Sequence, residues 1–368
     1  MDHYDFVIIG AGIAGCSVAF ELSKHNRNIL LIDKNSTAAK GASGAAGAFL
    51  SPLLGKANEF KTLVNEALRY SNIFYKENFP NYFNNCGTTR IPQNKEDEKK
   101  FQSYIPFMDF DYIKDEKGYF FKVGSVVESF NICKSMIEKS QSNVKTKFNY
   151  EVKNVVYKDE VWILNDEIIA KNIIFTTGDD ISLIDQFYLK LRSVWGRRID
   201  IKTSTEVSHN FHKACSVSQS KKIKDNKFFV SIGATHHRNK EGIDNITSNQ
   251  EELLRKANDI IALEDVEIVE HHVGSRACSV DYFPIVGEII DADKTIDEFP
   301  YMKNGTNVDA KRFTRFKNAY MINGVGGRGF VFAPYLAKQL VDFIIDKKEI
   351  RSQLKVDRLF KREVKRIK

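Results

Sequence analysis

One arginine lies in a segment of small and apolar residues that runs from His271 to Glu288 (HHVGSRACSVDYFPIVGE). A guanidinium keeps its charge at physiological pH, so an arginine in such surroundings needs an anionic partner. Asp281 is close in sequence, but neighbouring residues of a strand point to opposite faces and need not pair. Arg276 is therefore a candidate for binding a carboxylate, which suits its planar, two-pronged donor. The alternative is a structural ion pair with Asp281 or another acid.

Three glycines follow the first apolar run of the chain, in YDFVIIGAGIAGCSVAFELSKHNRNILLIDK. The pattern predicts a strand, a glycine turn, a helix and a second strand that ends at Asp33. Gly10 would make the tight turn, Gly12 would let a pyrophosphate approach the helix N-terminus, and Gly15 would let helix and strand pack closely. Asp33 lies where an acid would bind a ribose hydroxyl. This order favours dinucleotide binding over a glycine-rich turn in an unrelated α/β protein.

A second run of small residues, KGASGAAGAFLSPLLGK, indicates which dinucleotide binds. Every residue from 41 to 48 is Gly, Ala or Ser, a composition that cannot fill a core but lets the backbone press against a flat ring system. A flexible linker is the alternative. However, the apolar residues 49–54 follow at once, and linkers avoid such sequence.

A third glycine-rich segment lies near the end of the chain, in NAYMINGVGGRGFVFAPYLAKQLVDFII. The pattern predicts a strand over 319–323, a glycine turn, and a helix that reaches about residue 345. Pro334 fits only the first turn of a helix, so the helix should begin close to Gly329. Two helix N-termini from opposite ends of the chain suit FAD, one at the pyrophosphate and one at the flavin pyrimidine ring, where it would stabilise negative charge on the reduced ring. We therefore expect non-covalently bound FAD.

These motifs together resemble the D-amino acid oxidase-like family of FAD-dependent oxidoreductases, and the resemblance extends over nearly the whole chain. The segments NIIFTTGDD (172–180), GSRACSVDYFPIVG (274–287) and GVGGRGFVFAP (324–334) match family elements. The resemblance implies an α/β fold in which a Rossmann-type FAD-binding domain carries a β-rich substrate domain. It also implies an oxidase that acts on a CH–NH bond. The catalytic positions would be Arg276, which holds the substrate carboxylate, and Gly329, beside the flavin.

The expected cofactor-binding residues come from the three glycine-rich segments and from positions between them. Val152 is included by resemblance alone, because it matches a family position whose backbone contacts adenine. The full set is Gly10, Gly12, Gly15, Asp33, Lys34, Ser43, Gly44, Ala45, Ala46, Gly47, Ala48, Val152, Gly178, Gly326, Gly327, Arg328 and Gly329.

Within the family, the resemblance is strongest to oxidases that modify the wobble uridine of tRNA. It rests on ASGAAGAFLSPLLGK, GRGFVFAP and the basic ending DRLFKREVKR. The implied substrate is a uridine with a carboxymethylaminomethyl arm, which is chemically an N-substituted glycine; its oxidation would give the aminomethyl uridine and glyoxylate, with O₂ or another acceptor taking the electrons. Free glycine, sarcosine or a D-amino acid stays the alternative substrate. In that group a methyltransferase domain precedes the flavin motif, whereas here the motif begins at residue 6. We therefore expect the oxidase alone, with methylation either by a separate methyltransferase or absent.

The C-terminal segment 347–368 carries ten Lys or Arg and three Asp or Glu, so its excess charge equals the +7 of the whole chain. A solvated helix face or a frayed end is the alternative to function. Apolar residues at near-helical spacing, from Ile350 to Ile367, indicate that part of the segment packs against the protein. A basic patch is also the electrostatic footprint of a polyanion such as RNA. The residues expected to contact the anticodon arm of tRNA are Arg358, Lys361, Arg362, Lys365 and Arg366.

Composition and length set the broad class. With 368 residues, 42% hydrophobic and 28% charged, the chain reads as a globular protein of two domains. We see no membrane span, targeting segment, C-x-x-C pair or metal-ligand spacing, so we expect reduced cysteines and the cytosol. The FAD-binding domain should comprise 1–85, 124–182 and 268–368, and the substrate domain 86–123 and 183–267. Within the latter, 190–204 and 226–238 should form strands, and a helix should start at a cap on Ser248 or Asn249.

Overall fold

The computed structural model describes residues 1–367, and its largest parallel array of strands forms the core of an eight-stranded sheet. β1 pairs in parallel with β2 and β12, β2 pairs with β9, and β12 pairs with β20. The apolar runs of the sequence supply these strands because both faces of a parallel sheet are buried. The strands are β1 (Asp2–Ile9), β2 (Ile29–Ile32), β9 (Val144–Lys147), β10 (Val155–Lys158), β11 (Val161–Leu164), β12 (Ile168–Phe175), β19 (Ile285–Ile290) and β20 (Arg315–Asn323).

Helices α1 (Ile13–Ser23), α3 (Glu59–Asn78), α5 (Ser129–Ser140) and α9 (Gly329–Asp346) pack with this sheet in one hydrophobic core. α9 begins at Gly329, as the sequence predicts, but Pro334 is its sixth residue and lies in the second turn, not in the first turn as expected. Because Pro334 has no N–H, the carbonyl of Phe330 loses its partner within the helix. The buried hydroxyl of Tyr75 on α3 donates to that carbonyl at 2.9 Å. The proline therefore fixes where α3 and α9 meet.

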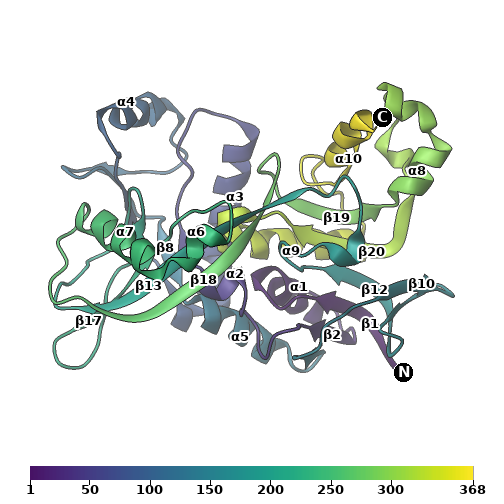
Figure 1. Cartoon of the computed structure of the whole chain (residues 1–368), viewed down its shortest axis with the longest axis horizontal. Coiled ribbons are helices and arrows are strands. Elements are labelled where there is room, and N and C mark those ends of the chain that lie inside the picture. The colour runs from purple at the N-terminus through teal and green to yellow at the C-terminus, as the bar shows by residue number, and fades with distance from the viewer. Residues whose placement is uncertain (368) are drawn as a thin grey trace.

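A nine-stranded sheet forms the other half of the molecule, in the order β18-β13-β17-β15-β14-β5-β7-β6, with β16 paired to β17. In Figure 1 it lies on the left with α7, while the eight-stranded sheet, α1 and α9 lie on the right. Its strands are β5 (Thr88–Arg90), β6 (Ile113–Lys114), β7 (Tyr119–Phe121), β13 (Leu191–Thr203), β14 (Asn210–His212), β15 (Ser216–Val217), β16 (Lys221–Lys222), β17 (Phe228–Gly233) and β18 (Glu267–Ser279). The other elements are α2 (Ala42–Ala45), α4 (Lys95–Tyr104), α6 (Glu241–Asp244), α7 (Ile246–Asn258), α8 (Ala292–Glu298) and a small sheet of β3 (Phe49–Leu50), β4 (Phe83–Asn84) and β8 (Ser125–Val127).

The two strands expected in the substrate half are confirmed as β13 and β17, but two details differ. β18 begins at Glu267 and pairs with β13 along its length, so it belongs to the nine-stranded sheet although 268–279 was assigned to the FAD-binding segments. The predicted cap of α7 at Ser248 or Asn249 is wrong. The side chain of Asn245 accepts a hydrogen bond from the backbone N–H of Ser248 at 3.0 Å, so Asn245 is the cap and the helix starts at Ile246. The division into two domains stays a prediction.

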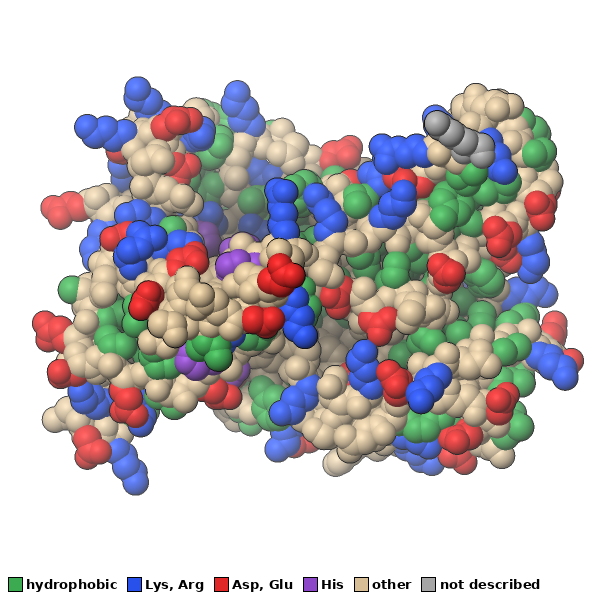
Figure 2. All heavy atoms as spheres, viewed as in Figure 1, with side chains coloured by type: hydrophobic (Ala, Val, Ile, Leu, Met, Phe, Trp, Pro, Cys, Tyr) green, Lys and Arg blue, Asp and Glu red, His purple; other side chains and the backbone are tan. Residues whose placement is uncertain are grey.

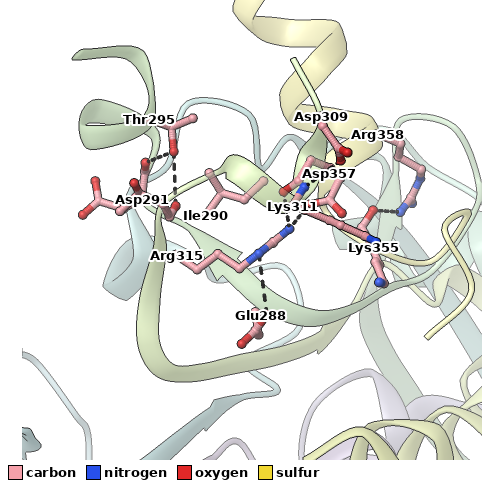
Figure 3. A network of polar contacts seen from close by, with 12 residues as sticks. Glu288, Ile290, Asp291, Thr295, Asp309, Lys311, Arg315, Lys355, Asp357 and Arg358 are labelled. Atoms are coloured by element: carbon pink, nitrogen blue, oxygen red, sulfur yellow. Dashed lines mark hydrogen bonds and ion pairs between the residues drawn. The ribbon is translucent and has the colours of Figure 1, made fainter. Parts of the chain in front are cut away.

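The C-terminal segment packs against the eight-stranded sheet. Leu354, Phe360 and Val364 are buried around α10 (Asp357–Glu363), which confirms the packing expected from their spacing. Figure 3 shows Arg315 of β20 between Glu288 of β19 and Asp357 of α10, with 2.6 Å between Arg315 Nη2 and Asp357 Oδ1. Among residues 1–367, no helix combines the length and the apolar character that crossing a membrane requires.

Candidate active site

A cavity of about 870 Å³ lies where the two halves meet. One wall is made by the carboxyl ends of β1, β2, β12 and β20, which is where open α/β sheets bind ligands. The other wall comes from β13, β17 and β18 of the nine-stranded sheet. The volume is at the upper end of the range for ligand sites, about 300–1,000 Å³. An extended ligand fits it.

The first glycine motif forms one part of the wall. Gly10 has φ +105°, a conformation that only glycine adopts readily, and a Cβ there would lie 2.5 Å from the carbonyl oxygen of Thr176. Gly12 caps α1 and lines the cavity. A Cβ on Gly15 would lie 1.9 Å from the carbonyl oxygen of Gly10, so Gly15 acts in packing and does not line the cavity. Gly10 and Gly15 thus have the turn and packing positions expected from the sequence, and the approach of a pyrophosphate at Gly12 stays a prediction.

Asp33 and Lys34 follow β2 at the same edge of the sheet. Asp33 accepts backbone hydrogen bonds from Ala11 at 2.7 Å and from Asn35 at 2.8 Å, which fixes its carboxylate at the cavity wall. Lys34 pairs with Asp180 at 3.1 Å, and this hydrogen bond raises the pKa of the lysine. The expected residues Val152 and Gly178 line the same region.

The run of small residues forms a tight loop around α2. Ser43 Oγ accepts from the backbone N–H of Ile13 at 2.9 Å, which ties this loop to the start of α1. Ser43 and residues 45–48 line the cavity. Gly44 does not: a Cβ there would lie 2.0 Å from the carbonyl oxygen of Ala39, so it serves close packing. Buried Arg198 of β13 donates to the carbonyl of Ala46 and so holds the loop from the other half.

The third glycine-rich segment completes the wall opposite Arg276. Residues 326–329 all line the cavity, and the N-terminus of α9 at Gly329 opens onto it. Gly326 has φ +56°, and a Cβ on Gly327 would lie 3.5 Å from Cδ of Arg276. Two helix N-termini thus face one cavity. Their free N–H groups and positive dipole ends suit a pyrophosphate and an electron-rich ring, so these residues fit FAD.

Arg276 lies inside this cavity, and no carboxylate of the described residues pairs with it. Its guanidinium crosses Gly196 of β13, where a Cβ would be 2.5 Å from both Nη1 and Nη2. Among residues 1–367 it forms no ion pair, and Nη1 is 3.4 Å from the carbonyl oxygen of Thr235. Burial lowers the pKa of Arg276, but an arginine stays charged at neutral pH. The expected alternative partner, Asp281, binds Arg358 instead.

Other charged and imidazole side chains line the same end of the cavity, and the sequence did not single them out: Arg90, His212 and His236. Burial, together with neighbouring arginines, lowers the pKa of both histidines, so both are neutral at pH 7. Burial also lowers the pKa of Arg90 and of Arg328 to about 10. Arg328 was expected among the cofactor residues; its side chain points to the same region as Arg90. No local motif marks Arg90 or the histidines, which lie on short strands or in a loop.

The basic residues between 347 and 366, the part of this segment that the structure describes, do not line the cavity. Arg358 is committed to internal contacts, and Arg362 and Arg366 both pair with the buried carboxylate of Glu363, at 2.9 and 3.1 Å. Lys361 lies over the ring of Phe313, and Lys365 is exposed. Figure 2 shows Lys and Arg side chains gathered at the upper right, around the position of α10, with acidic side chains among them. Their contact with tRNA stays a prediction.

Comparison with known proteins gives the class. Residues 5–343 match the family model "FAD dependent oxidoreductase" (DAO), so the chain belongs to this family and uses FAD as its cofactor. The crystal structure of glycine oxidase from Geobacillus kaustophilus has a TM-score of 0.71 to this fold at 15% identity, covering 95% of this chain and 96% of that one. Iminodiacetate oxidase from Chelativorans sp. BNC1 has a TM-score of 0.71 at 17% identity, covering 95% and 98%. The predicted fold class is confirmed.

Comparison with curated sequences finds relatives whose names give a more specific activity than the family does. The "tRNA 5-methylaminomethyl-2-thiouridine biosynthesis bifunctional protein MnmC" of Legionella pneumophila (strain Lens) is 24% identical over 365 residues, which cover 92% of this chain and 54% of that protein. The protein of the same name from Campylobacter fetus is 24% identical over 359 residues, covering 93% and 56%. The chain thus spans about half the length of the curated relatives it matches.

Proposed function

We propose that this chain oxidises the carboxymethylaminomethyl arm of a tRNA wobble uridine, with or without a 2-thio group. The products are the aminomethyl uridine and glyoxylate. The amine loses two electrons and two protons to give an imine, and water splits the imine. The unpaired guanidinium of Arg276, inside the cofactor cavity and against the loop at Gly327, is the observation that carries the proposal.

The residues of the chain bind and orient the substrate. Arg276 would hold the arm's carboxylate with two parallel hydrogen bonds, which fixes the neighbouring CH₂ relative to the α9 N-terminus. When bound, FAD accepts the hydride from this carbon. His212 and His236 are neutral at pH 7, so they add no positive charge that would repel a protonated amine before it loses its proton.

The names of the curated relatives support the tRNA substrate, and so does the excess positive charge of the C-terminal segment. The partners we propose are the anticodon arm of tRNA and, as electron acceptor, O₂ or another oxidant. An oxidase of free glycine, sarcosine or a D-amino acid is the second candidate, favoured by the fold shared with glycine oxidase.

One experiment separates the two candidates. The FAD-loaded enzyme is mixed without oxygen with tRNA that carries the modified uridine, and separately with glycine, sarcosine and D-alanine, while flavin absorbance is followed. We expect rapid bleaching by the modified tRNA and none by tRNA with unmodified uridine. Rapid bleaching by a free amino acid, with none by the modified tRNA, would reverse the choice.

A further inference from the structure

Two more arginines converge on the end of the cavity that holds Arg276. Arg90 ends β5, and its Nη1 is 3.2 Å from Ser51 Oγ and 2.8 Å from the carbonyl oxygen of Pro52. Arg328 comes from the other half of the molecule, and its Nη1 is 3.4 Å from the carbonyl oxygen of Ser51. Both guanidiniums therefore reach the same residue from opposite sides of the cavity.

Neither arginine forms an ion pair with a carboxylate among residues 1–367. Arg90 Nε is buried and has no hydrogen-bond partner there. The nearby charge of Asp97 raises the pKa of Arg90, but the two side chains form no ion pair. The carboxylate of Asp97 instead accepts a hydrogen bond from the backbone N–H of Gln93 at 3.0 Å. Two partly buried cations near one another without a counter-ion cost stability, so the arrangement favours an anion from outside the described residues.

The guanidiniums of Arg90 and Arg328 both reach Ser51, whereas that of Arg276 crosses Gly196. The cavity thus has two cationic regions, one at Ser51 and one at Gly196. A free amino acid brings a single carboxylate and leaves one region unpaired. A nucleotide with an N-substituted glycine arm brings two oxyanions, the carboxylate and a phosphate.

We propose that Arg90 and Arg328 form a second oxyanion site that binds a phosphate flanking the oxidised nucleoside, while Arg276 binds the carboxylate of its arm. This inference rests on the proposed function and makes it more specific: the enzyme selects a nucleotide that presents two anions, and a mononucleoside lacks one of them. Bidentate guanidinium–phosphate pairs supply both affinity and orientation.

The test uses a probe that cannot react. Binding of uridine, uridine 5′-monophosphate and uridine 3′-monophosphate to the FAD-loaded enzyme is measured from the change in flavin absorbance. We expect at least one monophosphate to bind tenfold or more tightly than uridine. Arg90→Gln and Arg328→Gln should bring the ratio close to one, whereas Arg255→Gln, on the exposed face of α7, should leave it unchanged. Flavin content and melting temperature check that each variant folds. The wild-type ratio decides the matter even if Arg90→Gln does not fold.

A parallel arm identifies the source of the second anion. Iminodiacetate, which has two carboxylates, is compared with glycine in the same variants. If binding of iminodiacetate requires Arg90 and Arg328 while binding of the two monophosphates does not, the site serves a small dicarboxylic amine. The phosphate proposal is then wrong. Equal binding of uridine and both monophosphates also overturns it. If the monophosphates bind through Arg90 but modified tRNA fails to bleach the flavin, the second site stands and the proposed reaction fails.

Discussion

The carboxylate of Asp281 accepts hydrogen bonds from Nε and Nη2 of Arg358, at 2.8 and 3.2 Å, although the two residues are 77 positions apart in the chain. Arg358 Nη2 also donates to the carbonyls of Phe283 and Pro284. This pair removes from Arg276 the acid that is nearest to it in sequence. The C-terminal helix thus contributes indirectly to the site, because it leaves the guanidinium in the cavity free for a substrate.

Breaking the ion pair between Asp281 and Arg358 should lower the stability of the fold. Hydrogen bonds to charged groups contribute roughly 1.5–3 kcal/mol, so we expect Asp281→Asn to lower the free energy of unfolding by about that amount. Burial by itself raises the pKa of Asp281, but the hydrogen bond and charge of Arg358 leave it below its ordinary value. The stabilisation is therefore complete above the ordinary carboxyl pKa, about 3.9, and is lost as pH falls through the lower folded value.

Urea unfolding of wild type and Asp281→Asn at several pH values checks both statements. The difference between the two proteins should shrink as the pH falls below about 4. Arg255→Ala is the control, since its ion pair is long and exposed and should change stability by less than about 0.5 kcal/mol. A pH-independent difference would show that the charge of Asp281 is not what stabilises the fold.

Alanine substitutions at two glycines of the first motif should have different effects, one on stability and one on FAD binding. In Gly15→Ala the new Cβ would lie 1.9 Å from the carbonyl oxygen of Gly10, so backbone must move and the protein should lose stability even without cofactor. Gly12 has φ −74°, which alanine adopts freely, and its Cβ would meet only Ser43 Oγ, at 3.1 Å. Gly12→Ala should therefore fold and yet bind FAD weakly, because the methyl group occupies the approach to the helix N-terminus. Melting curves of the apoproteins and flavin titration separate the two effects; normal FAD affinity in Gly12→Ala would contradict the cofactor position.

Sequence reasoning located the cofactor walls because glycine leaves a local signature there. A positive φ at Gly10 and a close approach at Gly15 exclude other residues whatever the rest of the fold does. Arg276 was found for a similar reason, since a charge among small residues is conspicuous. The place of β18 was missed because strand pairing is a long-range event: its partner β13 is far away in the chain, and no residue near 268 marks the change of sheet.

The other half of the cavity could not be predicted in this way. Arg90 is brought to the site by parallel pairing of β5 with β14, whose strands are three residues each and carry no periodic pattern. His212 comes with β14, and His236 lies in the loop after β17. Single polar residues in short strands look like surface residues in a sequence. Only the assembled sheet shows that they face a common cavity.

Arg276 should decide turnover and leave the cofactor bound. Losing one partner of a buried charge pair costs about 2–5 kcal/mol, so we expect Arg276→Gln to lower kcat/KM by roughly thirtyfold to several thousandfold with unchanged flavin content. Arg276→Lys keeps the charge but loses the two parallel hydrogen bonds, and should recover only part of the activity. Stopped-flow flavin reduction measures both variants. Full activity in Arg276→Gln would mean that the carboxylate is held elsewhere.

Asp200 should control FAD binding through Arg198. Asp200 Oδ2 is 3.0 Å from Arg198 Nη2 and 2.8 Å from His272 Nε2, and Arg198 holds the carbonyl of Ala46 in the small-residue loop. Asp200→Asn leaves a buried arginine without its counter-ion, a change that costs about 3–5 kcal/mol, and should raise the FAD dissociation constant. Ser231→Ala removes only one hydrogen bond to Asp200, of 2.6 Å, and should cost about 1 kcal/mol. Equal FAD affinities in Asp200→Asn and Ser231→Ala would show that the ion pair does not influence FAD binding through the small-residue loop.

The same aspartate predicts an acid limit for cofactor binding. Burial raises the pKa of Asp200, but hydrogen bonding to His272 and the charge of Arg198 bring it below the ordinary value. Its contribution is thus intact above a pH of about 4 and is lost as pH falls through the folded pKa. Between about pH 7 and pH 4, we expect Asp200 to cause little change in the FAD affinity of the wild type, as measured by FAD titration of wild type and Asp200→Asn. A loss of affinity near neutral pH that disappears in Asp200→Asn would contradict this placement.

The exposed end of the C-terminal segment should contribute to tRNA affinity through charge alone. Lys365 and Arg366 are exposed, and Glu363 keeps Lys190 at 2.7 Å and Arg362 at 2.9 Å when Arg366 is replaced, so Lys365→Gln/Arg366→Gln should fold normally. Each phosphate that the protein no longer neutralises lowers the slope of log affinity against log salt by about 0.7–0.9, so the double variant should reduce the slope by about 1.4–1.8. Lys76→Gln/Lys134→Gln, on α3 and α5 away from α10 (Figure 1), removes the same charge as a control and should change neither affinity nor slope. Filter binding or fluorescence anisotropy at several salt concentrations gives the slopes. If the tail variant keeps wild-type affinity and slope while the control loses them, tRNA binds near α3 and α5 and the basic segment has only a structural role.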